Sequence, residues 1–189
     1  MSINIDLGKT LKYLDWIKEM LFLDTKAISA KKRIVKRGEV YSCSFGMGIG
    51  SEESKERPCV IIQYDSANAY SPNTIVAPIT HTSSSLPVVI EVKSQNNLDG
   101  SILLDGNVLL GNITCISKAR LGKYITKLNQ EDMLKIDASI AISLDIKRHY
   151  DKLRNIYNDK LNYIIKLKAK VSELEAELEK RDKLLELLK

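Results

Sequence analysis

The sequence predicts a mainly β protein: an antiparallel barrel or sandwich with one packed helix, preceded by an amphipathic helix and followed by a long coiled-coil helix. Three patterns support this prediction. Short runs rich in Val, Ile and Tyr follow one another between residues 37 and 127, residues 5–23 have helical spacing, and residues from 146 onward repeat every seven positions. The predicted domains are an N-terminal helix with a basic linker at 1–34, a β domain at 35–146 and a coiled-coil helix at 147–189.

The N-terminal helix is predicted from a single apolar stripe. Its members recur at the spacings of one helical face, with five charged residues between them: Leu7, Leu11, Leu14, Ile17 and Leu21. The basic stretch at 26–37, KAISAKKRIVKR, links this helix to the β domain.

Short strands are expected throughout the β domain, because the apolar runs are bounded by Gly, Pro, Ser and Asn with no long helix between them. The expected strands are 38–45, 58–64, 74–80, 87–92, 101–104, 107–116 and 123–127. The glycine-rich loop at 46–58, GMGIGSEESKERP, joins two of these strands. A dinucleotide-binding or Walker-type phosphate loop opens a helix instead, so the glycine spacing alone does not predict a nucleotide site.

A second helix is expected after the last strand. Asn129 is the predicted N-cap, three residues before Asp132, and the apolar residues that follow line one face: Met133, Ile136, Ile140 and Leu144. This helix is expected to pack on the barrel.

The C-terminal segment carries a heptad seam. The first seam position holds Tyr150, Tyr157, Ile164, Val171, Leu178 and Leu185, and the second holds Leu153, Lys160, Leu167, Leu174, Arg181 and Leu188. This repeat predicts a coiled coil, and β-branched residues at the first position with Leu at the second favour two strands. The partner is either a second copy of the chain or the N-terminal helix.

The net charge of +5 is carried by the two ends of the chain. Seven basic and four acidic residues give +3 to 1–34, ten and twelve give −2 to 35–145, and twelve and eight give +4 to 146–189. The most basic stretch, 147–170, holds eight basic and two acidic residues with three interleaved tyrosines. Contact with RNA or the ribosome is one interpretation of this stretch. Partner or self-association is the other, because two of the tyrosines occupy seam positions.

Hydropathy and cysteine content exclude several protein classes. No apolar run approaches the length of about 20 residues that spans a bilayer, and the N-terminus lacks a signal-peptide pattern, so a cytoplasmic protein is expected. The three cysteines, Cys43, Cys59 and Cys115, lie in strand-like runs and are expected to be buried reduced thiols. Their wide spacing and the presence of only two histidines do not suit a metal site, and no cofactor is expected.

The motifs between residues 36 and 146 resemble the MazF/PemK toxin family in order and spacing. The stretch RGEVYSCSFGMGIGSEESKERPCVIIQYDSANAYSPNTIVAPIT matches the family's RGEVY, GSE, RPVVVIQND, N-x-x-SP and IVAPIT motifs. The similarity continues through LPVVIEV and VLLGNITCISKARLGKYITKLNQEDMLKID. It implies the SH3-like antiparallel barrel of the MazF, PemK and CcdB toxins and a homodimer. It also implies an antitoxin partner whose tail occupies the RNA groove, with DNA contacted only through that antitoxin.

The resemblance further implies metal-independent cleavage of single-stranded RNA at short sequences, with Arg57 and Thr80 as catalytic residues. Attack by the RNA 2′-hydroxyl leaves a 2′,3′-cyclic phosphate and a 5′-hydroxyl, and it requires stabilisation of negative charge around phosphorus. A guanidinium offers two parallel donors to phosphate, and a Thr hydroxyl donates or accepts nearby. Because Arg is a poor base, Arg57 is assigned to charge stabilisation and Thr80 to orienting the phosphate, which leaves the proton acceptor open. His81 is expected to face the other side of the strand.

Five residues are expected to contact RNA: Gly50, Ser51, Glu52, Asn112 and Thr114. The first three belong to the glycine-rich loop, which is expected to be a lid that brings Arg57 to the scissile phosphate; an ordinary hairpin loop is the alternative. Where family members commonly read LLEQIRTID, this chain reads LLGNITCIS, so Asn112 keeps a shorter amide and Thr114 replaces a charged arginine. These departures predict a different cleavage sequence or RNA affinity from elsewhere.

The expected function is therefore that of a toxin-type endoribonuclease in a toxin–antitoxin system. The alternative is a catalytically weakened MazF-like binding or adaptor module assembled through its coiled coil. The presence of Arg57 and Thr80 favours the enzyme, and the altered stretch at 111–117 favours the adaptor. The two helical additions are expected to set the oligomeric state or to recruit a partner.

Overall fold

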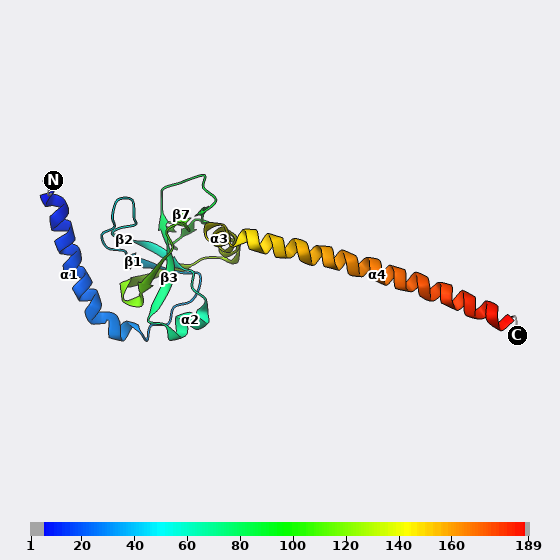
Figure 1. Ribbon diagram of the computed structural model, residues 1–189. Coiled ribbons are helices and arrows are strands. Elements are labelled where there is room, and N and C mark those ends of the chain that lie inside the picture. The colour runs from blue at the N-terminus through cyan, green and yellow to red at the C-terminus, as the bar shows by residue number, and fades with distance from the viewer. Residues whose placement is uncertain (1–5, 188–189) are drawn as a thin grey trace, which may run out of the picture. The chain divides into compact units, whose positions relative to one another are not determined.

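The computed structural model describes residues 6–187 and divides into two units, the first ending at Leu144 and the second beginning at Asp145 (Figure 1). The first unit contains the β domain together with the N-terminal helix. The second consists of one long helix.

A seven-stranded antiparallel sheet forms the β domain. Its strands run in the order β4–β7–β3–β2–β1–β9, with β8 paired to β3. Their bounds are β1 (Glu39–Ser44), β2 (Glu56–Ile61), β3 (Asn73–Thr80), β4 (Val89–Glu91), β7 (Asn107–Leu109), β8 (Thr114–Ser117) and β9 (Leu121–Lys127). A separate pair is formed by β5 (Gln95–Asn96) and β6 (Ile102–Leu104).

The strands expected from the sequence are largely present, and β5 is an additional strand that was not expected. The expected strand 107–116 is broken into β7 and β8, because the chain turns at residues 110–113, where the Asn112 amide donates to the Leu109 carbonyl at 3.2 Å. A short helix, α2 (Asp65–Tyr70), follows β2 and was not expected. A 3-10 turn, η1 (Lys118–Arg120), joins β8 to β9.

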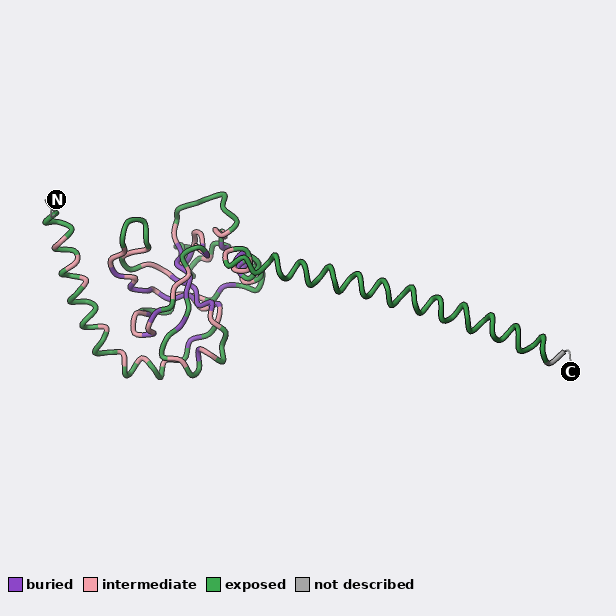
Figure 2. Tube along the Cα trace, viewed as in Figure 1, coloured by how far each residue is buried: buried purple, intermediate pink, exposed green. Residues whose placement is uncertain are grey.

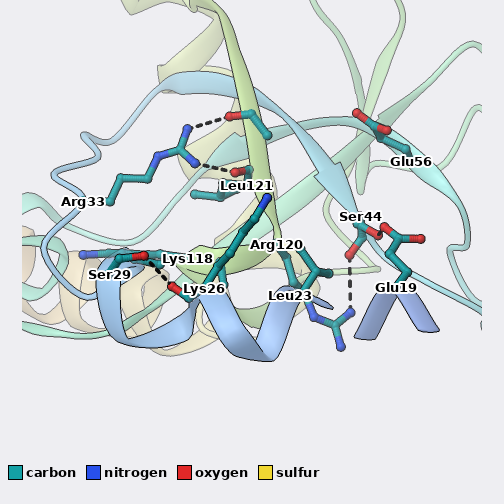
Figure 3. A pocket seen from close by; sticks show the side chains of 13 residues that line it. Glu19, Leu23, Lys26, Ser29, Arg33, Ser44, Glu56, Lys118, Arg120 and Leu121 are labelled. Carbon is teal, nitrogen blue, oxygen red and sulfur yellow. Dashed lines mark hydrogen bonds between the residues drawn. The ribbon is translucent and has the colours of Figure 1, made fainter. Parts of the chain in front are cut away.

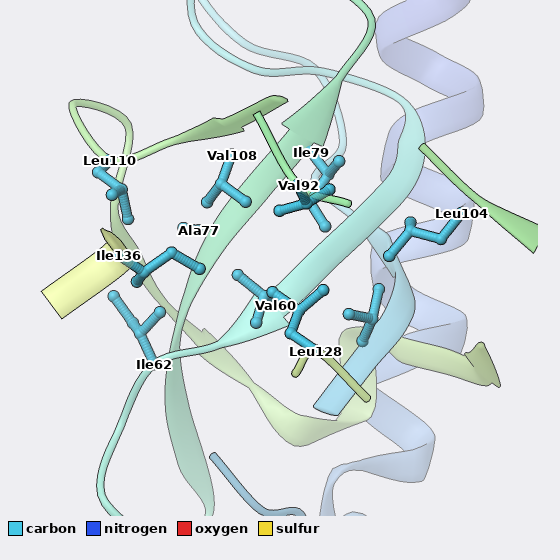
Figure 4. Packing of buried hydrophobic residues seen from close by; sticks show 11 residues of the cluster. Val60, Ile62, Ala77, Ile79, Val92, Leu104, Val108, Leu110, Leu128 and Ile136 are labelled. Atoms are coloured by element: carbon cyan, nitrogen blue, oxygen red, sulfur yellow. The ribbon is translucent and has the colours of Figure 1, made fainter. Parts of the chain in front are cut away.

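The central strands are buried on both faces. Val60 of β2 belongs to the larger core cluster, whereas its neighbours Cys59 and Ile61 belong to the smaller one. Figure 4 shows the larger cluster, in which side chains from β2 and β3 meet Leu128 and Ile136. Because successive strand residues point to opposite faces, this arrangement requires packing on either side of the sheet, as a barrel provides.

The helix α3 (Gln130–Ser143) covers the larger cluster, as expected from its apolar face. The Asn129 side chain caps it by accepting from the Asp132 amide at 2.8 Å, which confirms the predicted N-cap. Ile136 is fully buried, whereas Leu144 is 58% exposed, because the helix ends at Ser143 and the chain turns through a left-handed residue at Asp145.

The helix α1 (Leu7–Ala30) packs on the β domain beside η1. Glu19 contacts the Ser44 hydroxyl, and Arg33 donates to the carbonyls of β9, including that of Gly122 at 2.7 Å (Figure 3). Trp16 lies so close to Gly46 that a Cβ there would be 2.3 Å from the indole ring, and Gly46 has a φ of +85°. Glycine is therefore required at the base of the loop for α1 to dock.

The apolar stripe predicted on α1 is present but does not face the β domain. Its members are 44% to 71% exposed: Leu7, Leu11, Leu14, Ile17 and Leu21. Figure 2 shows α1 as exposed or intermediate along its length.

The second unit is the helix α4 (Lys147–Leu187), which is 41 residues long. Every residue from 147 to 185 is exposed, including those at the heptad positions (Figure 2). The last predicted seam residue, Leu188, lies outside the described residues. None of the helices in residues 6–187 combines the length and apolarity needed to cross a membrane.

Substitution of Ile136 tests the packing of α3. We expect Ile136→Ala to lower the free energy of unfolding by about 2–5 kcal/mol, because it leaves a cavity in a fully buried site. Leu134→Ala on the same helix is the matched control, since Leu134 is 62% exposed. Denaturant titration measures both, and equal effects of the two substitutions would contradict this packing.

Candidate active site

The pairing of β2 with β3 brings Arg57 and Thr80 together. The two strands are antiparallel, with Cys59 paired to Pro78, and continuing this register by two residues places Arg57 opposite Thr80. Directly opposed residues point to the same face of a sheet, so the guanidinium and the hydroxyl share one face. They come from positions 23 residues apart in the chain.

Both residues line an open cleft of about 440 Å³ at the ends of these strands. Its other walls include Lys55, His81 and Asp105. His81 was expected to face away from Thr80, and this expectation is wrong. Because β3 ends at Thr80, strand alternation no longer governs the next residue, and the imidazole Nδ1 lies 3.4 Å from the Asp105 carboxylate at the cleft rim.

The guanidinium of Arg57 is held by the glycine-rich loop. Its Nη1 lies 2.6 Å from Oε2 of Glu53, and its Nε donates to the Ser54 carbonyl at 3.1 Å. The Arg57 side chain remains 28% exposed. Its position is therefore fixed on the loop side, while part of the group stays accessible from the cleft.

The Thr80 hydroxyl has only weak partners. Its Oγ1 lies 3.4 Å from both the Thr82 amide and the Thr82 hydroxyl, at the long end of hydrogen bonding. Thr80 itself pairs with Asn107 of β7, so its backbone is fixed while its hydroxyl is available to a ligand.

A second cleft, of about 650 Å³, lies between the glycine-rich loop and the stretch 111–117. Three of the five residues expected to contact RNA line it: Glu52, Asn112 and Thr114. The other two, Gly50 and Ser51, are exposed at the loop tip and do not line this cleft. The Glu52 carboxylate accepts from the Ile49 amide at 2.9 Å, so it also shapes the loop.

Glu53 connects the two clefts, and the sequence analysis did not identify it. Its Oε1 accepts from the Asn112 side-chain amide at 3.2 Å while Oε2 binds Arg57. The Glu53 side chain is only 14% exposed. The spacing of four residues between Glu53 and Arg57 was a visible signal of an ion pair, but the contact with Asn112 depends on the path of the loop.

The loop has a defined base and a tight interior. The amides of Phe45 and Lys55 pair with carbonyls across its neck, Phe45 to Lys55 at 3.0 Å and Lys55 to Gly46 at 2.7 Å. A Cβ at Gly48 would lie 2.7 Å from the Glu52 side chain and 2.9 Å from the Glu52 carbonyl. Glycine at this position therefore allows the chain to pass close to Glu52.

Arg120 is a further basic group that the sequence analysis did not identify. It lines the second cleft, donates to the Phe45 carbonyl at 3.1 Å, and its guanidinium carbon lies 5.1 Å from the Trp16 ring. Arg120 is thus the only arginine among the residues lining that cleft, and its contact with Trp16 connects the cleft to α1.

Two of the three cysteines are buried and the third is exposed. Cys43 and Cys59 are buried as expected, and the pKa of the Cys59 thiol is raised by its hydrogen bond with Cys43 and by burial. The expectation that Cys115 is buried is wrong, because β8 pairs on one side only and its alternate residues face outward; Cys115 is exposed and lines the second cleft. Within residues 6–187, no three His, Cys, Asp or Glu side chains converge as a metal site would require.

The arrangement can bind an anionic group at the point where Arg57 and Thr80 meet. Arg57 offers a positive charge with directional donors, Thr80 offers an adjacent hydroxyl, and the second cleft supplies amide and hydroxyl groups beside them.

Comparison with known proteins identifies the same region. A family model described as "PemK-like, MazF-like toxin of type II toxin-antitoxin system" matches residues 36–144. Endoribonuclease EndoA of Bacillus subtilis (strain 168) is 39% identical over 113 residues, covering 59% of this chain and 95% of the relative. Endoribonuclease MazF of Staphylococcus epidermidis is 36% identical over 116 residues, covering 60% of this chain and 93% of the relative.

Solved structures share the fold. MazF from Deinococcus radiodurans has a TM-score of 0.52 at 13% identity and covers 60% of this chain and 98% of its own. An endoribonuclease in complex with its cognate antitoxin from a mycobacterial species has a TM-score of 0.50 at 24% identity, with coverage of 59% and 95%. These similarities confirm the predicted fold class.

Removal of the Glu53 carboxylate tests whether this group ties down the loop. We expect Glu53→Ala to speed amide hydrogen exchange within residues 47–54, because the contacts with Arg57 and Asn112 are both lost. Glu53→Gln keeps an acceptor for Asn112 and is expected to have a smaller effect. Glu173→Ala on α4 is the control, and exchange in Glu53→Ala equal to that control would contradict the role of Glu53.

Proposed function

The chain belongs to the PemK-like, MazF-like toxin family of type II toxin–antitoxin systems, and from this premise we propose that it is an endoribonuclease toxin that cleaves single-stranded RNA at short sequences without a metal ion. The convergence of Arg57 and Thr80 on one cleft carries the proposal. We assign the activity to residues 35–146, with 1–34 and 147–189 as additions to the toxin domain.

The proposed reaction is an internal transfer at phosphorus. The ribose 2′-oxygen bonds to phosphorus as its proton leaves to a base, and the bond from phosphorus to the 5′-oxygen breaks as that oxygen gains a proton. The products are a 2′,3′-cyclic phosphate and a 5′-hydroxyl. Negative charge accumulates on the non-bridging oxygens during this transfer, so donors fixed near them lower the barrier.

Arg57 is the residue best placed to stabilise that charge. Glu53 and Ser54 fix its guanidinium from the loop side, which limits the reorganisation needed when a phosphate arrives. Thr80 contributes a hydroxyl with only weak partners, and we assign it to orienting the phosphate.

The second cleft is the proposed path for RNA next to the scissile phosphate. Asn112 and Thr114 offer amide and hydroxyl groups to base edges, and Glu52 lies opposite them on the loop. Gly50 and Ser51, at the exposed loop tip, reach RNA only if the loop closes over the strand. The proposed closure gives the glycine-rich loop the role of a lid.

The Glu53 carboxylate competes with RNA for Arg57. A phosphodiester that uses Nη1 must replace or share the 2.6 Å contact with Glu53. Displacement of Glu53 also frees Asn112, so binding at one cleft is coupled to the other.

The proposed partners follow from the family. One relative in this fold was solved in complex with its cognate antitoxin, and we propose that an antitoxin covers the same two clefts here. We also propose a homodimer through the barrel and, since mRNA is the proposed substrate, action in the cytoplasm.

A weakened, adaptor-like form is the second candidate. It is favoured by Thr114, which stands where the family motif has an arginine, and by the neutralisation of Arg57 by Glu53. The two candidates differ in whether RNA is cut or only bound.

Substitution of Arg57 distinguishes them. Purified protein incubated with a long mixed-sequence RNA in EDTA is expected to give fragments with cyclic phosphate ends. Arg57→Ala should lower the cleavage rate by about 10²–10³-fold, as does loss of one charge-stabilising donor in other enzymes. Arg57→Lys should recover little, because it keeps the charge but loses the planar fork. Thr80→Ala should lower the rate by a smaller factor.

Arg148→Ala, which removes an exposed guanidinium from α4, is the control. If the unchanged protein binds RNA but does not cleave it, the adaptor is favoured. If the Arg57→Ala variant cleaves RNA as fast as the unchanged protein, the assignment of the site is wrong.

Introduction of a charge at position 114 tests the RNA path. We expect Thr114→Arg to tighten RNA binding and to steepen its salt dependence by about 0.7 in the slope of log affinity against log salt, the value for one added contact to a single strand. Thr25→Arg on the exposed side of α1 adds the same charge elsewhere and should leave the slope unchanged. Identical slopes for the two variants would contradict the proposed path.

A further inference from the structure

The helix α4 presents an apolar seam, interrupted only by Lys160 and Arg181, whose residues are exposed throughout 147–185. Its seam residues are 45% to 70% exposed: Tyr150, Leu153, Tyr157, Ile164, Leu167, Val171, Leu174, Leu178 and Leu185. The apolar surface of a heptad seam of this length is removed from water only when a second helix of similar length covers it.

Charge on α4 is divided between its two halves. Residues 147–170 carry eight basic and two acidic side chains, a net charge of +6, whereas residues 171–187 carry three basic and six acidic side chains, a net charge of −3. Two copies aligned in parallel would place like charge beside like charge along the whole helix. Two antiparallel copies place each basic half beside an acidic half.

Two charged residues within the seam favour the same orientation. In a parallel pair in register, Lys160 would face Lys160 of the second copy, and Arg181 would face Arg181 of the second copy. In an antiparallel pair, first seam positions face second seam positions. Each of these charged side chains then faces a residue that is not cationic and can extend its charged end to water.

One antiparallel register pairs the seam residues without placing two cations together and also brings residues of opposite charge beside the seam into contact. It aligns Tyr157 with Leu174 of the second copy, and the remaining layers are Leu153 with Leu178, Ile164 with Leu167, Lys160 with Val171, and Tyr150 with Arg181. Two of the pairs beside the seam then have opposite charge, Lys147 with Asp182 and Arg154 with Glu175. A shift of one heptad brings Lys168 against Lys168 in one direction and against Arg154 in the other.

We propose that α4 forms an antiparallel two-stranded coiled coil with α4 of a second copy of this chain, in the register that aligns Tyr157 with Leu174. The helix α1 is a poorer occupant, because its 24 residues cover little more than half of the 41-residue seam. RNA is a poorer occupant too, since phosphates leave the apolar seam exposed. The proposal does not depend on the ribonuclease function.

Cysteine cross-linking in the full chain tests the orientation. Cys115→Ser removes the exposed native thiol, and Cys43 and Cys59 are buried. Tyr157→Cys and Leu174→Cys are then introduced singly or together, in a buffer where oxidised glutathione accepts the two electrons of each new disulfide. We expect the double variant to form a covalent dimer, and the two single variants to form one only when mixed.

Charge reversal tests the register. In the double-cysteine protein, Arg154→Glu should cause loss of the cross-linked dimer at low salt, and addition of Glu175→Arg should restore it, because the pair is then reversed. Lys152→Glu makes the same charge change outside the seam and its flanks and should leave the yield unchanged.

Two results would overturn the proposal. Covalent dimers of each single variant alone would show a parallel coil. Absence of cross-linking in every sample, measured on protein whose unfolding midpoint matches that of the parent, would show that α4 does not pair with itself and that another occupant covers the seam.

Discussion

The antiparallel pairing of β2 with β3 is the constraint on which the candidate site depends. Continued by two residues beyond Cys59 and Pro78, this pairing places Arg57 across from Thr80, and it is itself fixed by the buried residues of β2 that follow Arg57. Cys59 and Ile61 are buried on one face and Val60 on the other. A slip of one residue would turn all three to the wrong face and separate the guanidinium from the hydroxyl. The core therefore sets the geometry of the cleft, and two of its residues, Ile79 and Leu104, also line it.

The glycine-rich loop adds an ion pair to the site, between Glu53 and Arg57. The Glu53 carboxylate holds the Arg57 guanidinium in position. Because it also occupies one of the donors of that guanidinium, it weakens the ability of Arg57 to bind phosphate. Because the same carboxylate accepts from Asn112, the state of the loop is linked to both clefts. Glycines at two points permit this path: Gly46, where α1 docks, and Gly48, where the chain passes Glu52. The added helix is thus joined to the base of the loop through Trp16.

Local periodicity explains what the sequence could predict. The strand runs, the cap at Asn129 and the helical character of the C-terminal segment each depend on residues close together in the chain, and the structure contains them. Arg57 and Thr80 were identified by their place in a family pattern, because no local signal links them. The exposure of Cys115, the position of His81 and the contact of Glu53 with Asn112 depend on where a strand ends or a loop turns. Tertiary packing determines those features, and a single sequence does not reveal it.

The most direct test of the central claim is the coupling between Arg57 and Thr80. Single-turnover cleavage rates are measured for the unchanged protein, Arg57→Ala, Thr80→Ala and the double variant. If both side chains act on one phosphodiester, the double variant loses little more activity than Arg57→Ala alone, because residues that act as a unit are strongly non-additive. Losses that simply multiply would show that the two residues act independently and would contradict the account.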